Sequence, residues 1–227
     1  MKRLFFTLGT IIIFCSLGWI SFAQSTQSTS IPIISAENYK RTLDAVFAKT
    51  GQQSTMQYSM VLRFMPSRHA ESEITIQVDN KGRVHVALTA VTGTSVWNLA
   101  NEYIRQTGRF NLEEITRRAQ VEKKEISADS AKAIIWHSEA LKSLGQTTAE
   151  LQQDFVQFQK TGEAAIFLDG STYEMRFTQG VTEFHCTVMD AEVDDHEVTG
   201  RSSLANWMNS VRLYLTARVG GWPSSEK

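Results

Sequence analysis

The chain of 227 residues has few cysteines and prolines, almost no net charge and a single long uncharged run near its start. With only 2 Cys it is not a disulfide-held scaffold, because those small folds are dense in cysteine. One apolar run is too few for a polytopic membrane protein. A net charge of −1 with 42% hydrophobic residues excludes a disordered tail and gives no electrostatic reason to expect a nucleic-acid partner. A globular protein of one or two domains remains.

The chain also lacks the short motifs that identify common enzyme classes. It contains no G-x-x-x-x-G-K-[ST], G-x-G-x-x-G, G-x-S-x-G, C-x-x-C or H-E-x-x-H sequence. His196 and Glu197 begin like a zinc-protease helix, but Gly200 stands where the second histidine ligand belongs. We therefore expect no cofactor and no metal, and the sequence identifies neither a catalytic residue nor a ligand-binding residue.

What the sequence does contain is an export signal at residues 1–23. Lys2 and Arg3 are followed by an uncharged stretch up to Phe22, and residues 21–23 (SFA) place small side chains at both positions of an A-x-A-like cleavage site. An alternative is that the run stays attached as a membrane anchor. Lipid attachment at Cys15 is disfavoured by bulky Phe14. In each case the rest of the chain is exported, to the periplasm or outside the cell. The absence of an N-x-[ST] sequon fits a bacterial source.

Cleavage after Ala23 changes the composition of the mature chain. It removes two basic residues and no acid, so 21 basic residues face 24 acidic ones and the net charge becomes −3. It also removes Cys15, so Cys186 has no partner for an intramolecular disulfide. The mature fold must therefore be held by its hydrophobic core, with no membrane contact after cleavage.

A flexible polar leader is expected over residues 24–34, followed by a first α-β-β-β-α unit over residues 35–109. A helix starts at Ser35. Period-two alternation then predicts antiparallel strands at residues 56–64, 74–78 and 84–90, and a second helix runs over residues 95–106. The sequence DNKG at residues 79–82 is typical of a hairpin turn, and Gly108 of a helix end.

The second half repeats this order. Residues 110–128 form a charged connector, interpreted as a short helix plus an edge strand. A second α-β-β-β-α unit over residues 129–221 then has helices at 129–144, 148–159 and 201–218, strands at 164–168, 172–178 and 181–190, and a hairpin at residues 169–170; residues 222–227 are a tail. Val84–Leu88 resembles Phe184–Val188, which leaves an internal duplication open. The fold class is α+β, with antiparallel sheets and amphipathic helices packed on one face.

Two clusters invite a chemical role, and neither supports one. His185 and Cys186 are neighbours on a strand, so their side chains point to opposite faces and cannot act as a base and its nucleophile. Cys186 shares its face with Phe184 and Val188 and is interpreted as a core residue. The acidic stretch of residues 190–197 fails as a calcium loop, because Asp195 and Arg201 occupy the glycine and glutamate positions.

One weak positive feature is the polar face that the alternating strands leave opposite their apolar one. An open antiparallel sheet has such a face by default, but His, Arg and Glu on it offer a place for a ligand or partner, and two such sheets could also face each other or pair in a dimer. The residues expected there are Ser59, Arg63, Thr75, Gln77, His85, Thr89, Glu174, Arg176, Glu183, His185 and Thr187.

Three hypotheses for function follow. The first is an exported, non-enzymatic protein that binds an unknown protein or small ligand, with a homodimer as one arrangement. The second is an exported hydrolase whose site is assembled from scattered residues, with His85, His185 and the acids of 190–197 as candidates, because such groups can meet in a fold without a motif. The third is a structural or assembly subunit anchored by residues 1–23.

Overall fold

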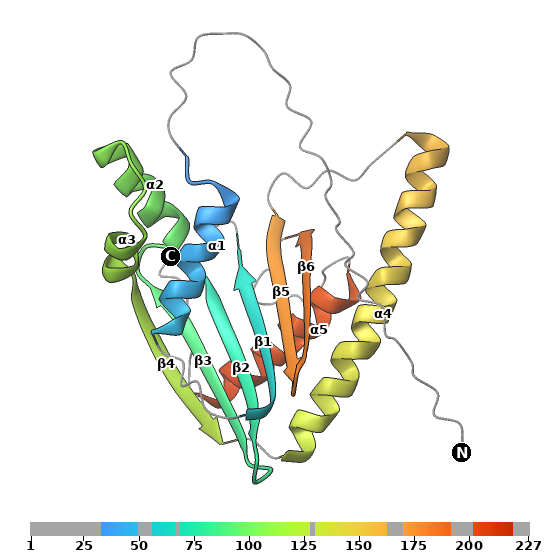
Figure 1. The fold of residues 1–227 in the computed structure, drawn as a ribbon. Helices are drawn as coiled ribbons and strands as arrows, with labels where there is room; N and C mark the ends of the chain where they lie inside the picture. The colour runs from blue at the N-terminus through green and yellow to red at the C-terminus, as the bar shows by residue number, and fades with distance from the viewer. Residues whose placement is uncertain are drawn as a thin grey trace, which may run out of the picture. The chain divides into compact units, whose positions relative to one another are not determined.

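The computed structural model describes residues 33–49, 56–66, 69–127, 130–162, 170–191 and 202–219, which belong to a unit spanning Pro32–Lys227. Within these ranges the chain forms one antiparallel sheet with helices on both faces (Figure 1). Several sequence expectations lie outside the described residues: the signal at 1–23, the leader up to residue 32, the strand at 164–168 with the turn that follows it, the acids at 192–197 and the tail at 222–227.

The elements follow the expected order through the first half and into the charged connector. They are α1 (Ala36–Ala48), β1 (Met56–Met65), β2 (Ser72–Asp79), β3 (Val84–Thr92), α2 (Val96–Thr107), α3 (Leu112–Arg118) and β4 (Gln120–Ser127). The second half contributes α4 (Ser130–Thr161), β5 (Gly170–Gln179), β6 (Thr182–Ala191) and α5 (Ser203–Arg218). This confirms the α+β class.

The strands of both halves belong to the same six-stranded sheet, in the order β4-β3-β2-β1-β5-β6. Every neighbouring pair is antiparallel, and the pairing of β1 with β5 joins the two halves. The halves therefore do not carry separate sheets that could face each other. The expected edge strand in residues 110–128 is confirmed as β4, which pairs with β3 at one edge of the sheet.

The ends of the helices and the first hairpin are fixed by the residues that the sequence indicates. Ser35 and Ser95 cap α1 and α2 by accepting hydrogen bonds from Asn38 N and Asn98 N. Gly108 ends α2 in the left-handed conformation, with φ of 72°. In the β2–β3 turn, hydrogen bonds from the backbone and side chain of Arg83 lower the pKa of Asp79 to about 2.

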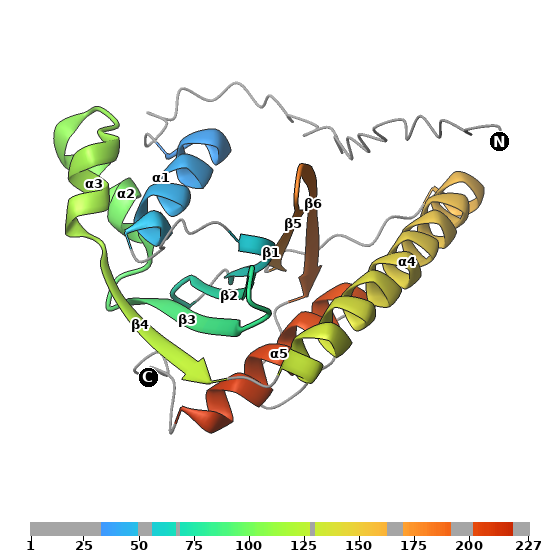
Figure 2. The same cartoon turned by 60° about the horizontal axis from the view of Figure 1, so that its bottom comes forward.

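One face of the sheet carries the main hydrophobic core and is covered by α4 and α5 (Figure 2). We call it the apolar face. Its side chains alternate along the strands, so the residues between them point to the opposite, polar face. The core residues are Met60, Leu62, Phe64, Ile74, Ile76, Val86, Leu88, Tyr173, Met175 and Val188 from the sheet, with Ala133, Trp136, Ala140, Leu204, Ala205, Trp207, Met208, Val211 and Leu215 from the helices.

The polar face is covered at one end by α1, α2 and α3, so helices lie on both faces rather than on one (Figure 1). Leu43, Val46 and Phe47 of α1 pack with Val91 and Val96. The last residue of the expected leader also belongs to this layer. Ile34 is buried against α2 and α3 and donates a backbone hydrogen bond to Asn101 Oδ1 at 2.8 Å, so this residue of the expected leader is part of the packed layer.

The buried carboxylate of Glu71 joins α1 to α2. It accepts hydrogen bonds from Val96 N (2.8 Å) and Trp97 N (3.1 Å) at the start of α2, where the helix dipole favours an anion. It also accepts one from the Tyr39 hydroxyl at 2.6 Å. Burial, with the nearby Glu71 charge, raises the pKa of Tyr39 well above its usual range. The helical layer that borders the polar face is thus fixed by specific polar contacts as well as by packing.

The two helices expected at 129–144 and 148–159 are instead the single helix α4, which continues through Gly145. A glycine costs a helix only about 1 kcal/mol relative to alanine, so it need not end one. The sequence also predicts that the apolar residues at helical spacing in these two segments are buried. Leu144 packs partly against the core, but Ile134, Leu141, Leu151, Phe155 and Phe158 are exposed. Ala133, Trp136 and Ala140 provide the packed face instead. In the part of the chain that the structure describes, no helix is long and apolar enough to span a membrane.

Candidate binding site on the polar face

Strand register places a set of charged residues side by side on the polar face. Arg63 on β1 lies directly opposite Glu73 on β2 and, on its other side, directly opposite Glu174 on β5. Cross-strand neighbours on one face are about 5 Å apart, close enough for opposite charges to pair. Arg176, two residues beyond Glu174, lies opposite His185 on β6. The register alone therefore builds a row of charged and ionisable side chains across four strands.

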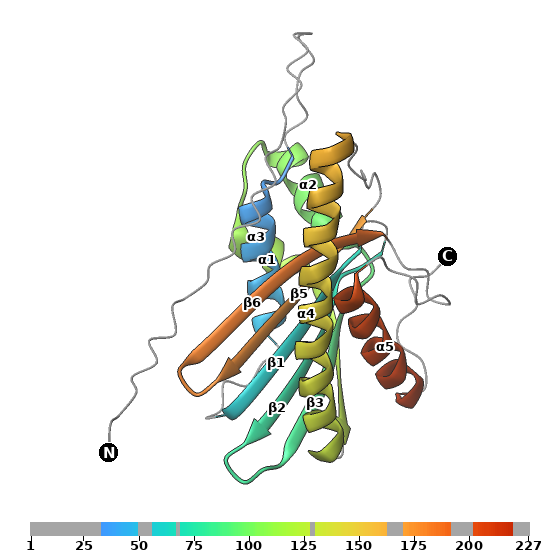
Figure 3. The ribbon, with the colours of Figure 1, turned by 90° about the vertical axis from the view of Figure 1, so that its right-hand side faces the viewer.

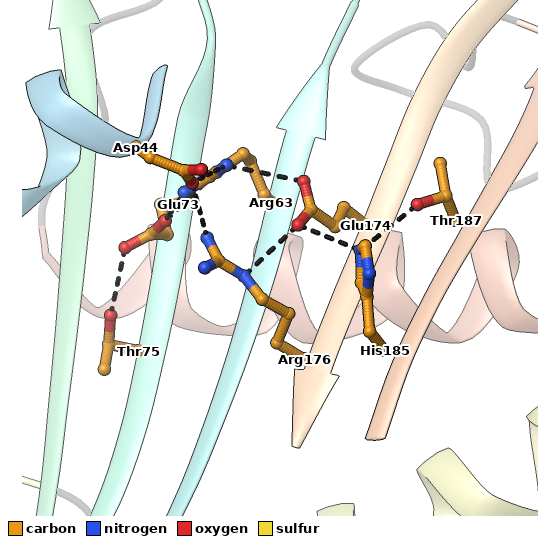
Figure 4. Close-up of polar contacts among 8 residues, drawn as sticks. All are labelled: Asp44, Arg63, Glu73, Thr75, Glu174, Arg176, His185 and Thr187. Atoms are coloured by element: carbon orange, nitrogen blue, oxygen red, sulfur yellow. Dashed lines mark hydrogen bonds and ion pairs between the residues drawn. The ribbon is translucent and has the colours of Figure 1, made fainter. Parts of the chain in front are cut away.

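The Arg63 guanidinium is the centre of this row and is 1% exposed. Its Nε and Nη2 donate to Glu73 Oε2 at 3.1 and 2.8 Å, and its Nη1 donates to Asp44 Oδ1 of α1 at 2.8 Å (Figure 4). A longer contact of 3.4 Å joins Nη1 to Glu174 Oε2. The ring of Phe47 covers the guanidinium, 5.2 Å from its carbon. Burial alone would lower the pKa of Arg63, but Glu73 and Glu174 outweigh it and raise that pKa, so the side chain stays charged.

Arg176 extends the row toward β6 and toward solvent. Its Nη2 donates to the same Asp44 Oδ1 at 3.0 Å, so one carboxylate oxygen of α1 bridges the two arginines. Its Nε lies 3.2 Å from Glu174 Oε1. Arg176 and Asp44 are 30% and 41% exposed, whereas Glu174 is buried. The buried side chains of Arg63 and Glu174 thus position the charged ends of Arg176 and Asp44, which solvent can reach.

His185 ends the row. Its Nε2 lies 3.1 Å from Glu174 Oε1 and 3.3 Å from the hydroxyl of Thr187. Burial lowers the pKa of His185, with Lys40 and Arg176 acting in the same direction and Glu174 opposing them. The ring is therefore neutral at pH 7. We name Asp44, Arg63, Glu73, Glu174, Arg176 and His185 the Arg63 cluster.

The Arg63 cluster is close to balanced in charge and incompletely satisfied in hydrogen bonds. It contains two arginines, three carboxylates and a neutral histidine. Glu174 Oε1 and Arg176 Nε are buried and, among the described residues, neither has a partner with hydrogen-bond geometry, although they lie within ion-pair distance of each other. A buried acceptor and a buried donor at the edge of an open surface are unusual in a purely structural ion pair.

The hydrolase candidates that lie within the described residues, His85, His185 and Asp190, do not come together. His85 on β3 and His185 on β6 are separated by three intervening strands, about 19 Å at the usual strand spacing. His85 lies 3.7 Å from Asp79. Asp190, the described member of the acidic stretch, is buried and accepts a hydrogen bond from Ser202 N at 2.7 Å, near the start of α5. Cys186 packs against the core on the apolar face, as expected, and its side chain diverges from that of His185.

Nor does His185 have the arrangement of a catalytic triad. In a triad the nucleophile and the orienting carboxylate bind opposite nitrogens of the ring. Here Thr187 and Glu174 both approach Nε2. Among the described residues no group of three or more His, Cys, Asp or Glu side chains could hold a metal ion.

Sequence reasoning placed Arg63, Glu174, Arg176, His185 and Thr187 on the polar face, and the structure brings these five together (Figure 4). It brings Ser59, Thr75 and Gln77 to the same face. His85 and Thr89 on β3 also lie on this face, opposite Gln77 and Glu73, one strand farther from Arg63. Glu73 and Asp44 were missed. Glu73 was missed because β2 begins two residues earlier than the alternation suggested. Asp44 was missed because its role depends on where α1 docks.

The comparisons with known proteins add no relationship: no family model, curated protein or solved structure matches this chain.

Proposed function

We propose that the protein is exported and non-enzymatic, and that it binds a partner protein on the uncovered half of the polar face. The observation that carries this proposal is the Arg63 cluster, in which buried charges hold Arg176, His185 and Asp44 at the border of an uncovered sheet surface. A buried ion pair is weak evidence for stability, because well-packed apolar residues often replace it without loss. A role in presenting the exposed members accounts for the cluster better.

The chemistry of the surrounding surface favours a protein over a small molecule or a base. We call the part of this face that no described helix covers the open half; its residues are half-buried or, for Thr178, exposed, and include Ser59, Val61, Thr75, Gln77 and Thr178. Within the described strands, no Phe, Tyr or Trp lies on the polar face, so it lacks the platforms on which bases stack and the aromatic lining that small-molecule sites prefer. Hydroxyls, an amide and exposed charges of both signs suit the polar surface of another protein.

A photo-crosslinking amino acid at Thr178, which is exposed on β5 beside Arg176, tests the proposal. The matched control carries the same group at exposed Arg105 of α2, which lies outside the open half. In cells that export the protein, we expect a discrete adduct from Thr178, none from Arg105, and a weaker Thr178 adduct when Arg176→Glu is added. Equal adducts from both positions, or none from Thr178, would contradict the proposal.

The hydrolase hypothesis keeps one supporting observation: a neutral, partly exposed His185 beside the carboxylate of Glu174 has the charge state of a general base. A panel of ester, amide and phosphoester substrates distinguishes it from binding. Turnover that disappears in His185→Gln but persists in the control His85→Gln would replace the binding proposal with a hydrolytic one.

A further inference from the structure

The second half of α4 projects past the helix that packs beside it (Figures 2 and 3). The N-terminus of α5 lies level with residues 147–150 of α4. Leu204 N donates to Thr147 Oγ1 at 2.8 Å, and Ser203 N donates to Glu150 Oε2 at 3.0 Å. Beyond this point every described residue of α4, from 151 to 161, is exposed. An isolated helical segment this short is marginally stable in water, so an unsupported end would normally fray.

Helix α4 nevertheless carries a row of mostly apolar side chains with coiled-coil spacing, which continues into the exposed segment and which we call the seam. Alternating steps of three and four residues, which define a heptad repeat, run through the helix for almost four heptads. Leu144 and His137 sit where the seam meets the body of the protein, and both pack partly against the sheet side. The positions of the seam are Ile134, His137, Leu141, Leu144, Thr148, Leu151, Phe155 and Phe158.

We propose that a second copy of this chain covers the seam, so that two α4 helices pack against each other in a symmetric dimer. Five apolar seam residues are 46–71% exposed in the single chain. With about 200 Å² for each side chain when fully exposed, they present about 550 Å² per chain, and a pair would bury about 1,100 Å². With complete burial of the seam, that area just clears the roughly 1,000 Å² that is the minimum for a specific interface.

The seam suits a copy of itself better than a lipid surface. Helices that lie on membranes carry many Lys and Arg on their polar face. The charged residues of α4 are Lys132, Glu139, Lys142, Glu150, Asp154 and Lys160, three of each sign, and its exposed second half is rich in glutamine. A two-fold pair brings the same uncharged seam to both sides of the contact, as an isologous interface requires.

Sedimentation equilibrium of the exported form of the chain tests the dimer. The seam variant is Leu151→Gln with Phe155→Gln and Phe158→Gln. We expect a dimer mass for the wild type at about 100 μM and a monomer mass for the variant, whose dissociation constant should rise by at least about 100-fold. The three side chains are exposed in the single chain, so the near-ultraviolet spectrum of the core should stay unchanged.

Val156→Gln is the matched control, because Val156 is as exposed as Phe158 but lies outside the seam, about 100° around the helix from Phe155. It should remain a dimer. A monomeric wild type, a seam variant that still dimerises, or an equal effect of Val156→Gln would each overturn the proposal. A monomer that floats with lipid vesicles would also overturn it, because a membrane would then cover the seam. So would a monomer whose residues 151–158 are protected from hydrogen exchange, because another segment of the chain would then cover the seam.

Discussion

Leu62 and Arg63 are neighbours on β1, both are 0–1% exposed, and they lie in opposite environments. Leu62 points into the apolar face, among the side chains of α4, α5 and the sheet. Arg63 points into the polar face, among three carboxylates and the ring of Phe47. The two faces thus stabilise their buried side chains differently. The apolar face packs hydrocarbon against hydrocarbon, whereas the polar face pairs each buried charge with charges of opposite sign.

The difference matters because the two solutions fail differently. A truncated leucine costs the transfer free energy of the lost apolar atoms plus a term for the cavity that remains. A truncated arginine takes the counter-charge from Glu73 and leaves Asp44 and Glu174 with Arg176, which costs more than the pair itself contributed. The two faces therefore differ in kind, because the loss on the polar face spreads to the charged partners that remain.

The largest effect is expected from Arg63→Ala. Removing the guanidinium takes the counter-charge from Glu73 and leaves Asp44 and Glu174 with Arg176, and we expect a loss of about 3–5 kcal/mol of unfolding free energy at pH 7. Urea titration followed by tryptophan fluorescence measures it. Arg63→Lys is the control: it keeps the charge, loses the forked geometry, and should fall between the wild type and Arg63→Ala.

If the penalty comes from uncompensated charge, neutralising the partners should relieve it. Arg63→Met combined with Glu73→Gln and Glu174→Gln should recover much of the stability that Arg63→Met alone loses. A triple variant as unstable as the single one would mean that the shape of the guanidinium, rather than its charge, holds the polar face together.

Leu62→Ala is expected to cost somewhat less, about 2–5 kcal/mol in the range typical of fully buried leucine. The same urea titration measures this loss. A larger loss of unfolding free energy in Leu62→Ala than in Arg63→Ala would show that the faces do not differ in the way proposed.

The apolar face was largely predictable from sequence because its signal is local. Period-two alternation gave β1, β2, β3, β5 and β6 to within a few residues, and Ser35, Ser95 and Gly108 marked helix ends through caps that involve only adjacent turns. The same alternation correctly assigned the opposite side chains to a polar face.

The Arg63 cluster was not predictable as a cluster because it depends on distant pairing. Arg63 meets Glu174 across 111 residues of sequence, through the register of β1 against β5. Asp44 reaches both arginines because α1 docks over that register. Periodicity also misdirected α4: its strongest apolar stripe is exposed in the single chain, because alanines and Trp136 provide the face that packs on the core.

The smallest effect is expected at the exposed end of the cluster, in His185→Gln. Burial, aided by Lys40 and Arg176, lowers the pKa of His185 in the folded state below its ordinary value of about 6.5. Between those two values the unfolded chain binds the proton that the folded chain refuses, so unfolding takes up protons and stability falls as the pH drops. The wild type should therefore lose stability relative to His185→Gln from about pH 6.5 downward, and the two should run parallel above it. Urea midpoints of both proteins at a series of pH values from 5 to 8 measure this difference. If the wild type gained stability on acidification relative to the variant, the charge of Glu174 would affect the pKa of His185 more than burial does. His185 would then be stabilised by ion pairing, as Arg63 is.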